Sequence, residues 1–122
     1  MNCLKILDEV INNISPNKKK MLELAETGFM TATDLADYLV KNHSMSFREA
    51  YQKTAAIVNL AEKKKKKLNE LTIDELKKVE TNLTNEVLRV FDLKNSVNSK
   101  KSYGGTAFEN IKKMIIKYKK QI

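Results

Sequence analysis

The sequence is poor in several residue types, and each shortage excludes a class of protein. It has 122 residues with no tryptophan, one cysteine and one histidine. A lone Cys3 cannot form an intrachain disulfide, which suits a reducing compartment, and a zinc site would lack its usual set of ligands. Three glycines and one proline are too few for a β-rich or disordered chain. We therefore expect a single helical domain.

Long apolar runs are also missing. No uninterrupted run approaches the roughly 18 residues of a membrane helix. The N-terminal segment carries Asp8 and Glu9 inside its apolar pattern, so it lacks the continuous apolar stretch of a secretory signal. We predict a cytoplasmic protein with no membrane contact.

Arginine is scarce although the net charge is +8. Apart from Arg48 and Arg89, every basic residue is a lysine, and lysine is the weaker choice for bidentate recognition of phosphates and bases. The densest basic patch is the run of five lysines at residues 63–67. It could contact nucleic acid or an anionic membrane. We favour a solvated helix end, where lysines complement the helix dipole, and expect no specific nucleic acid partner.

Apolar spacing predicts helices along the whole chain, because no segment alternates apolar and polar residues over a strand length. Residues 3–14 carry an apolar stripe typical of the end of a longer helix. A second helix is expected to begin at Ser15-Pro16 and to end at Gly28, and a third to begin at Thr31 with Asp34 as its acidic partner. The predicted fold class is all-α.

Four further helices follow from capping patterns. Ser46 begins one whose predicted buried stripe is Phe47, Tyr51, Thr54, Ala55, Val58 and Ala61. Thr72 and Thr84 begin two short helices, and residues 94–103 are predicted to be a loop. Thr106 caps the last helix, whose predicted buried residues are Phe108, Ile111, Met114, Ile115 and Tyr118. About seven helices are therefore expected.

Three short blocks give a resemblance to a known family. Residues 32–40 read Ala-Thr-Asp-Leu-Ala-Asp-Tyr-Leu-Val, residues 47–50 read Phe-Arg-Glu-Ala, and residues 104–107 read Gly-Gly-Thr-Ala. Their order and spacing resemble the C-terminal domain of argininosuccinate lyase, in the fumarase/aspartase superfamily with the delta crystallins. The motif residues, to which we assign a structural role, are Thr33, Asp34, Leu35, Tyr38, Phe47, Arg48, Glu49, Gly104, Gly105 and Thr106.

The sequence departs from the family's pattern at positions next to the second and third blocks. Ser46 and Tyr51 replace a proline and a histidine, Ala55-Ala56 replaces a Gly-Lys pair, and Lys100 replaces an arginine. No role that needs those replaced side chains is expected in this chain.

The resemblance implies two short helical hairpins packed across each other, plus an N-terminal helix. Residues 1–122 would be one domain, in which residues 1–15 end a helix leading from a missing catalytic domain and residues 16–122 are the C-terminal helical domain. The family cleaves argininosuccinate to arginine and fumarate in homotetramers, so the remainder of a lyase is the implied partner. Its serine-bearing catalytic loop, which contains a Met-Pro pair, is absent here. We therefore assign no catalytic, cofactor-binding or metal-binding residue.

Other candidates for chemistry have simpler interpretations. Asp34 and Asp37 could form an acid/base pair, but Asp34 is expected to serve the helix start and Asp37 to be solvated. His43 is expected to be an exposed turn residue. Gly104-Gly105-Thr106 is too short for a phosphate-binding loop, and Gly105 suggests a positive φ or a close backbone approach.

Two rival hypotheses stay open. One is a small basic helical protein that binds nucleic acid, and the other is a helical interaction module. An exposed apolar face on residues 3–14 would favour the interaction module, and this face could also cause self-association.

Overall fold

The computed structural model describes residues 2–121, and the regular elements in this part of the chain are all helices, with no strand. The predicted all-α class is therefore confirmed. The α-helices are α1 (Asn2–Asn12), α2 (Lys18–Thr27), α3 (Ala32–His43), α4 (Phe47–Lys63), α5 (Ile73–Lys77), α6 (Leu93–Ser99) and α7 (Phe108–Lys119). Two 3-10 helices, η1 (Leu68–Glu70) and η2 (Asn85–Phe91), connect them.

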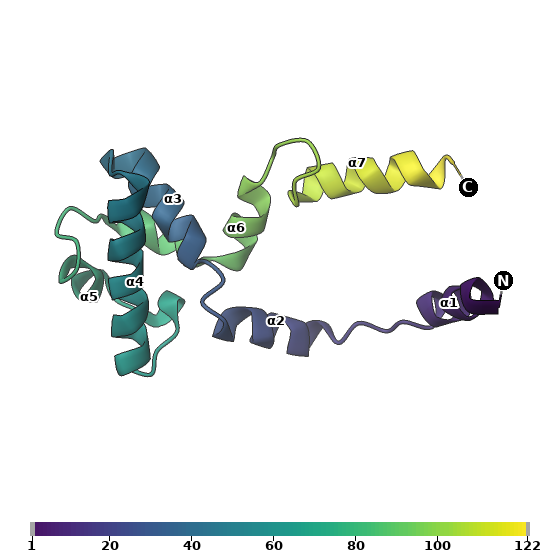
Figure 1. Ribbon diagram of the computed structural model, residues 1–122, viewed down its shortest axis with the longest axis horizontal. Helices are drawn as coiled ribbons and strands as arrows, with labels where there is room; N and C mark the ends of the chain where they lie inside the picture. The colour runs from purple at the N-terminus through teal and green to yellow at the C-terminus, as the bar shows by residue number, and fades with distance from the viewer. Residues whose placement is uncertain (1, 122) are drawn as a thin grey trace.

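The core lies where α3 and α4 form a hairpin and η2 packs against α3 (Figure 1). It is built from buried aliphatic side chains and one phenylalanine: Leu35, Leu39, Ala50, Ile57, Ala61, Leu68, Leu71, Leu76, Leu83, Val87 and Phe91. Opposite the α3–α4 hairpin stand the short segments α5 and η2. The chain thus has one long helical hairpin, α3–α4. The short segments α5 and η2 take the place of the second hairpin that was expected.

Two helix starts match the predicted capping boxes. The Ser46 hydroxyl accepts a hydrogen bond from the Glu49 N–H at 3.3 Å, and the Glu49 carboxylate accepts one from the Ser46 N–H at 3.0 Å. Thr72 and Glu75 form the same reciprocal pair at the start of α5. Each box satisfies backbone donors that a helix start leaves free.

The other predicted caps lack the expected side-chain bond, although α3 and η2 do begin directly after Thr31 and Thr84. Helix α2 begins after Asn17, whose side chain accepts from the Lys20 N–H at 3.0 Å, so Ser15-Pro16 is not its cap. Thr31 and Thr84 occupy cap positions but make no side-chain cap bond. Helix α7 begins after Ala107, so Thr106 is not its cap either.

The predicted loop at residues 94–103 is also wrong in its first half, which forms α6. Asp92 caps this helix, because its carboxylate accepts a hydrogen bond from the Lys94 N–H at 2.8 Å. The Asn and Ser residues of α6 hide its periodicity, and a local cap compensates for their low helix propensity.

The predicted buried stripes of α4 and α7 need correction. On α4 the core takes Ala50, Thr54, Ile57 and Ala61, whereas Phe47, Tyr51 and Ala55 are exposed. All the apolar residues predicted to be buried on α7 are exposed. Periodicity gave the right helices, but it could not show which face has a neighbour to cover it.

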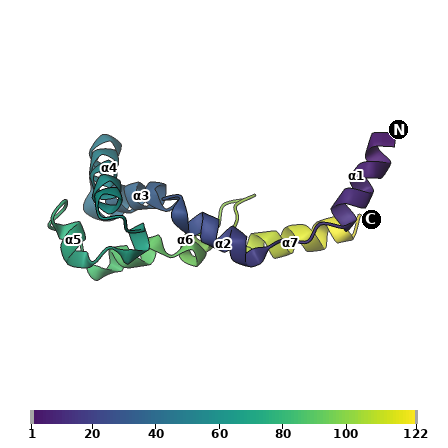
Figure 2. The same ribbon diagram turned by 90° about the horizontal axis from the view of Figure 1, so that it is seen from below.

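The molecule is elongated, with two arms that leave the core toward the same end (Figures 1 and 2). One arm is α2 followed outward by α1, and the other is α7. The predicted stripe on residues 3–14 is exposed at Leu4, Ile6, Leu7, Val10, Ile11 and Ile14. Among residues 2–121, none of the helices is long and apolar enough to span a membrane.

Candidate functional site

An open groove of about 670 Å³ lies between α3, η2 and α6. Its lining is mostly polar and charged: Asp34, Asp37, Tyr38, Lys41, Asn42, Glu86, Arg89, Val90, Asn95, Ser96, Ser99 and Lys100. The groove joins residues of the first sequence block to residues just before the third. The groove is therefore the candidate functional site.

Asp34 is the centre of the contacts in this groove. Its Oδ2 accepts a hydrogen bond from the Ser96 hydroxyl at 2.5 Å, and its Oδ1 pairs with Lys100 Nζ at 2.5 Å. The hydrogen bond to the Asp34 carboxylate, together with its negative charge, raises the pKa of Lys100 above its usual value. Both carboxylate oxygens of Asp34 are thus engaged, in addition to its expected place as the acidic residue in the first turn of α3.

Local structure explains how these three side chains meet. Asp34 lies in the first turn of α3, where a carboxylate also complements the helix dipole. Ser96 and Lys100 are four residues apart at the end of α6, a spacing that places two side chains on one helix face. The contact therefore fixes the end of α6 against the start of α3.

This arrangement holds structure together and offers little chemistry. The Asp34 carboxylate is bound by a hydroxyl and an ammonium group, so it is not a free base. Asp37 lines the same groove and is exposed, as expected. Across residues 2–121, the side chains of His, Cys, Asp and Glu form no cluster of three or more that could hold a metal ion.

The third block builds the loop that leads from α6 into α7. Gly104 has a φ of +77°, and the Ala107 N–H donates to the Lys100 carbonyl at 3.2 Å. The Thr106 hydroxyl donates to the Val97 carbonyl at 3.4 Å. A Cβ on Gly105 would lie 2.2 Å from the Lys100 carbonyl oxygen, so the predicted close backbone approach is present. The block closes a turn onto the end of α6.

The second block lies apart from the groove. Glu49 serves the capping box of α4, whereas Phe47 and Arg48 point to the outside of the domain and are exposed. Of the remaining motif residues, Leu35 is in the core, Tyr38 is half-buried and Thr33 is exposed. Asp34 and Tyr38 are thus the motif residues that the groove brings together.

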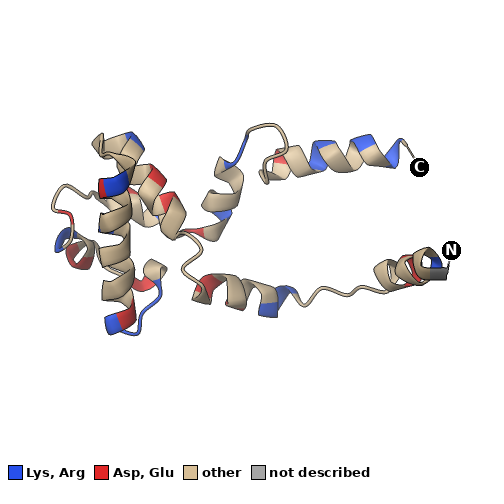
Figure 3. Cartoon of the chain, viewed as in Figure 1, with Lys and Arg blue, Asp and Glu red and all other residues tan. Residues whose placement is uncertain are grey.

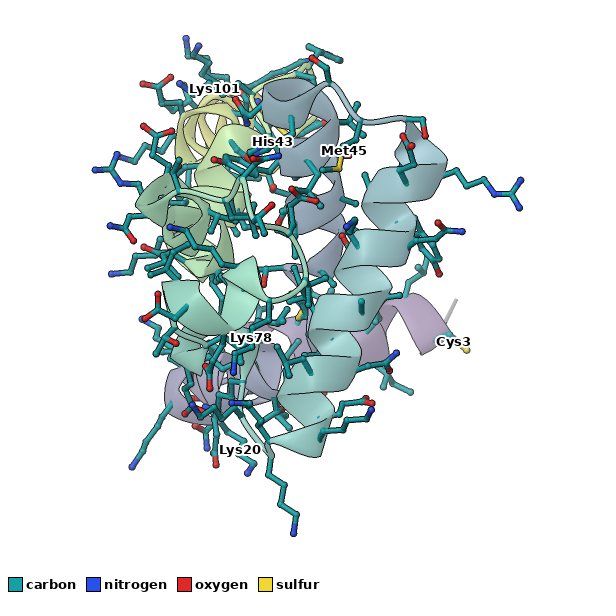
Figure 4. The ribbon with its side chains drawn as sticks, turned by 90° about the vertical axis from the view of Figure 1, so that its left-hand side faces the viewer. Cys3, Lys20, His43, Met45, Lys78 and Lys101 are labelled. Carbon is teal, nitrogen blue, oxygen red and sulfur yellow. The ribbon has the colours of Figure 1, made fainter. Side chains whose placement is uncertain are left out.

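His43 is not the exposed turn residue that the sequence suggested. It ends α3, is half-buried, and its ring lies 5.6 Å from the Tyr38 ring (Figure 4). Its Nε2 is buried without a hydrogen-bond partner in the described part of the chain. One imidazole that belongs to no cluster of metal-binding side chains in residues 2–121 supports packing.

The lysine run at residues 63–67 is partly used inside the domain. Lys64 and Lys66 pair with the Glu75 carboxylate at 2.6 and 2.9 Å, and Lys67 pairs with Glu26 at 2.9 Å. Acidic and basic residues are also interspersed over the core helices (Figure 3). Lys63 and Lys65 are exposed at the end of α4, as expected, and the pairings of the other three lysines weaken the support for a nucleic acid surface.

Glu75 gives this domain a specific acid sensitivity. The hydrogen bond from Lys64, with those from the Thr72 N–H and Lys66, lowers the pKa of Glu75 from 4.5 to about 2. A lowered folded-state pKa stabilises the fold above the unfolded-state value, and this stabilisation is lost as the pH falls toward 2. We expect Glu75→Gln to be less stable than the parent at pH 7 and to approach it in acid.

Urea unfolding of both proteins at pH 7, 4.5 and 2.5 measures this difference, with pH values chosen about the two pKa values. Glu109→Gln, on exposed α7, is the matched control and should follow the parent at every pH. A stability gap for Glu75→Gln that does not shrink in acid would contradict the assignment.

The comparison with known families decides the identity of this fold. A family model described as "Argininosuccinate lyase C-terminal" matches residues 29–98, more than half of the chain. The chain belongs to the argininosuccinate lyase C-terminal family. The resemblance read from the sequence blocks is therefore confirmed. The matched segment spans α3 through most of α6 and includes the core and the Asp34–Ser96 contact.

Similar proteins of this family come from several bacteria. An argininosuccinate lyase of Pelagibacter ubique is 73% identical over 98% of this chain and 26% of its own length. Those of Ehrlichia chaffeensis and Nitratiruptor sp. are 47% and 46% identical over 91% and 92% of this chain. The chain spans about a quarter of the length of the curated relatives it matches.

Within this argininosuccinate lyase C-terminal fold, sequence analysis missed the contact that matters most. It treated Lys100 as a replaced motif residue and placed it in a loop. Two signals were present: Asp92 as a helix cap, and the spacing of Ser96 and Lys100. Both become informative only once residues 93–99 are recognised as a helix.

Proposed function

We propose that this chain acts as the non-catalytic C-terminal domain of an argininosuccinate lyase. The relatives it matches carry that name and are about four times longer, which leaves room for a separate catalytic part. The proposed reaction of the whole lyase is the release of fumarate and arginine from argininosuccinate. Residues 1–122 would form one domain, with 1–15 the end of a helix from the catalytic part and 16–122 the C-terminal helical domain.

The observation that carries this proposal is the contrast between the core and the arms. The core packs its own apolar residues, and the groove carboxylate of Asp34 is already bound. The arms α1, α2 and α7 carry large apolar side chains that are exposed along their whole length. Such faces normally mark an interaction surface. The arms would pack against the remainder of the lyase, in the cytoplasm and within a homotetramer.

The motif residues fit a structural role in this proposal. Asp34 and Leu35 hold α6 and the core, Glu49 caps α4, and Gly104 to Thr106 turn the chain into α7. The exposed stripe on residues 3–14 would allow the free chain to self-associate. Activity would then require the full-length oligomer.

A split-enzyme experiment tests the proposal. The Pelagibacter ubique lyase, shortened by the region to which this chain is similar, is mixed with the chain, and fumarate is followed by ultraviolet absorbance. We expect no fumarate from the chain alone, and much more from the mixture than from the shortened lyase alone. The reason is that the chain supplies packing surfaces and no acid or base.

A variant in the arm is the matched control. Leu7→Lys places a charge on the exposed face of α1 and should leave the core intact, so it should fail to restore activity. Fumarate produced by the chain alone in proportion to its concentration would contradict the proposal. So would a mixture that stays inactive although the chain is folded by circular dichroism.

A further inference from the structure

The outer face of α4 has apolar side chains that the domain does not cover. Phe47 and Tyr51 are 66% and 65% exposed, and their rings lie 6.5 Å apart, within the range of an aromatic pair. Ala55 continues this face one turn further and is exposed. Helix α4 therefore has a second apolar face besides the one in the core.

Opposite charges flank this face symmetrically. Arg48 and Glu62 lie about two helical turns before and after Ala55, and both are exposed. The hydrogen bonds and ion pairs of residues 2–121 include none to either of these two side chains. The face thus carries an arginine at its start, a small residue at its centre, and a carboxylate beside the exposed Lys63 near its end.

We propose that this face of α4 binds the same face of a second copy of the chain. Two α4 helices crossing antiparallel at Ala55 bring Arg48 of each copy beside Glu62 of the other. The small Ala55 side chains let the two helix axes approach to roughly 8 Å, the lower end of ordinary helix packing. A two-fold axis makes every contact occur twice, which is the property of a self-complementary interface.

Charge favours a second copy over an unrelated partner. A helix of another protein would need a carboxylate opposite Arg48 and a cation opposite Glu62, each about two turns from a small residue, and a second α4 already presents these in reverse. In this arrangement Tyr51 of one copy faces Asn59 of the other. Phe47 of one copy lies against the aliphatic part of the Lys63 side chain of the other. Each aromatic ring therefore covers an aliphatic or amide group, and Phe47 also lies near the ammonium group of Lys63. The inference concerns the chain by itself and does not depend on its proposed place in a lyase.

The expected dimer is weak. One pair of helices of this length buries less than the roughly 1,200 Å² of a standard stable interface. We expect a dissociation constant on the order of 100 µM, so the measurement is sedimentation equilibrium between about 10 µM and 1 mM.

Charge reversal identifies the interface. Arg48→Glu alone and Glu62→Arg alone each place like charges opposite each other twice, so each should weaken the dimer by about tenfold or more. The double variant Arg48→Glu/Glu62→Arg restores the pairing with the signs exchanged and should return dimerisation to the parental level. All of these proteins carry Leu7→Lys, which removes association through the exposed stripe on residues 3–14, so the dimer that is measured reports on α4.

A crosslink gives an independent readout of the register. In a Cys3→Ser background, Ala55→Cys should form an intermolecular disulfide with oxidised glutathione, because two thiols meet at the axis. Thr81→Cys, exposed in the loop after α5, should stay unlinked under the same conditions. In the Leu7→Lys background, a monomer at 1 mM or a double variant that fails to recover would each overturn the proposal.

Discussion

Leu39→Ala should lower the free energy of unfolding by about 3 kcal/mol, within the range measured for buried leucine truncations. Leu39 is 0% exposed on α3 and is part of the cluster that joins α3 to α4. Its truncation removes apolar contacts and leaves a cavity that the neighbouring helices cannot easily close. Urea unfolding followed by circular dichroism at 222 nm, beside the parent, measures the loss.

Leu24→Ala is the matched control because it makes the same chemical change on α2. Leu24 is 59% exposed, so its truncation should alter stability by no more than about 0.5 kcal/mol. Equal losses of unfolding free energy in the two variants would mean that α2 packs onto the core in solution. That result would contradict the arrangement in which α2 extends away from the core.

Gly105→Val should open the turn into α7 while leaving the core intact. A Cβ at Gly105 would meet the Lys100 carbonyl oxygen at 2.2 Å and the Ser102 carbonyl oxygen at 2.9 Å. Both are backbone atoms, so the loop must shift, at a strain of about 2 kcal/mol. The Ala107 N–H would lose its bond to Lys100, and its hydrogen exchange should speed up roughly 30-fold.

Hydrogen exchange separates this local effect from global unfolding. Core amides such as that of Leu39 should exchange at the parental rate. Gly28→Ala is the control, because a Cβ there meets the nearest side-chain atom at 3.6 Å, an ordinary contact. Parental exchange at Ala107 in Gly105→Val would show that Gly105 does not constrain the turn.

The features that the sequence predicts correctly are those that depend on a few neighbouring residues. The capping boxes at Ser46 and Thr72 are local, because the two bonds of each join residues three apart. Gly105 behaves as predicted for a related reason, since a glycine after an irregular segment often allows a close backbone approach. The family resemblance added the most, because nine consecutive residues of the first block carry more information than periodicity.

The failures are features that only tertiary structure decides. Periodicity shows that α4 and α7 are amphipathic, but a stripe is buried only where another element reaches it. Phe47 and Tyr51 therefore look like core residues in the sequence and lie on the surface. Thr106 had the pattern of a cap, yet its hydroxyl bonds to Val97. The pairing of Asp34 with Lys100 could not be predicted from sequence spacing, because the two residues are 66 positions apart.

The order of elements in the core also has a kinetic meaning. The residues of the core cluster run from Leu35 to Phe91, and α3 and α4, its most extensive pair, are joined by a short turn. Contacts between sequence neighbours close small loops and form quickly. During synthesis this unit could fold as soon as η2 leaves the ribosome, while Lys100 and α7 are still enclosed in its exit tunnel. The Asp34–Lys100 bond would then form last, docking a late helix onto a finished core.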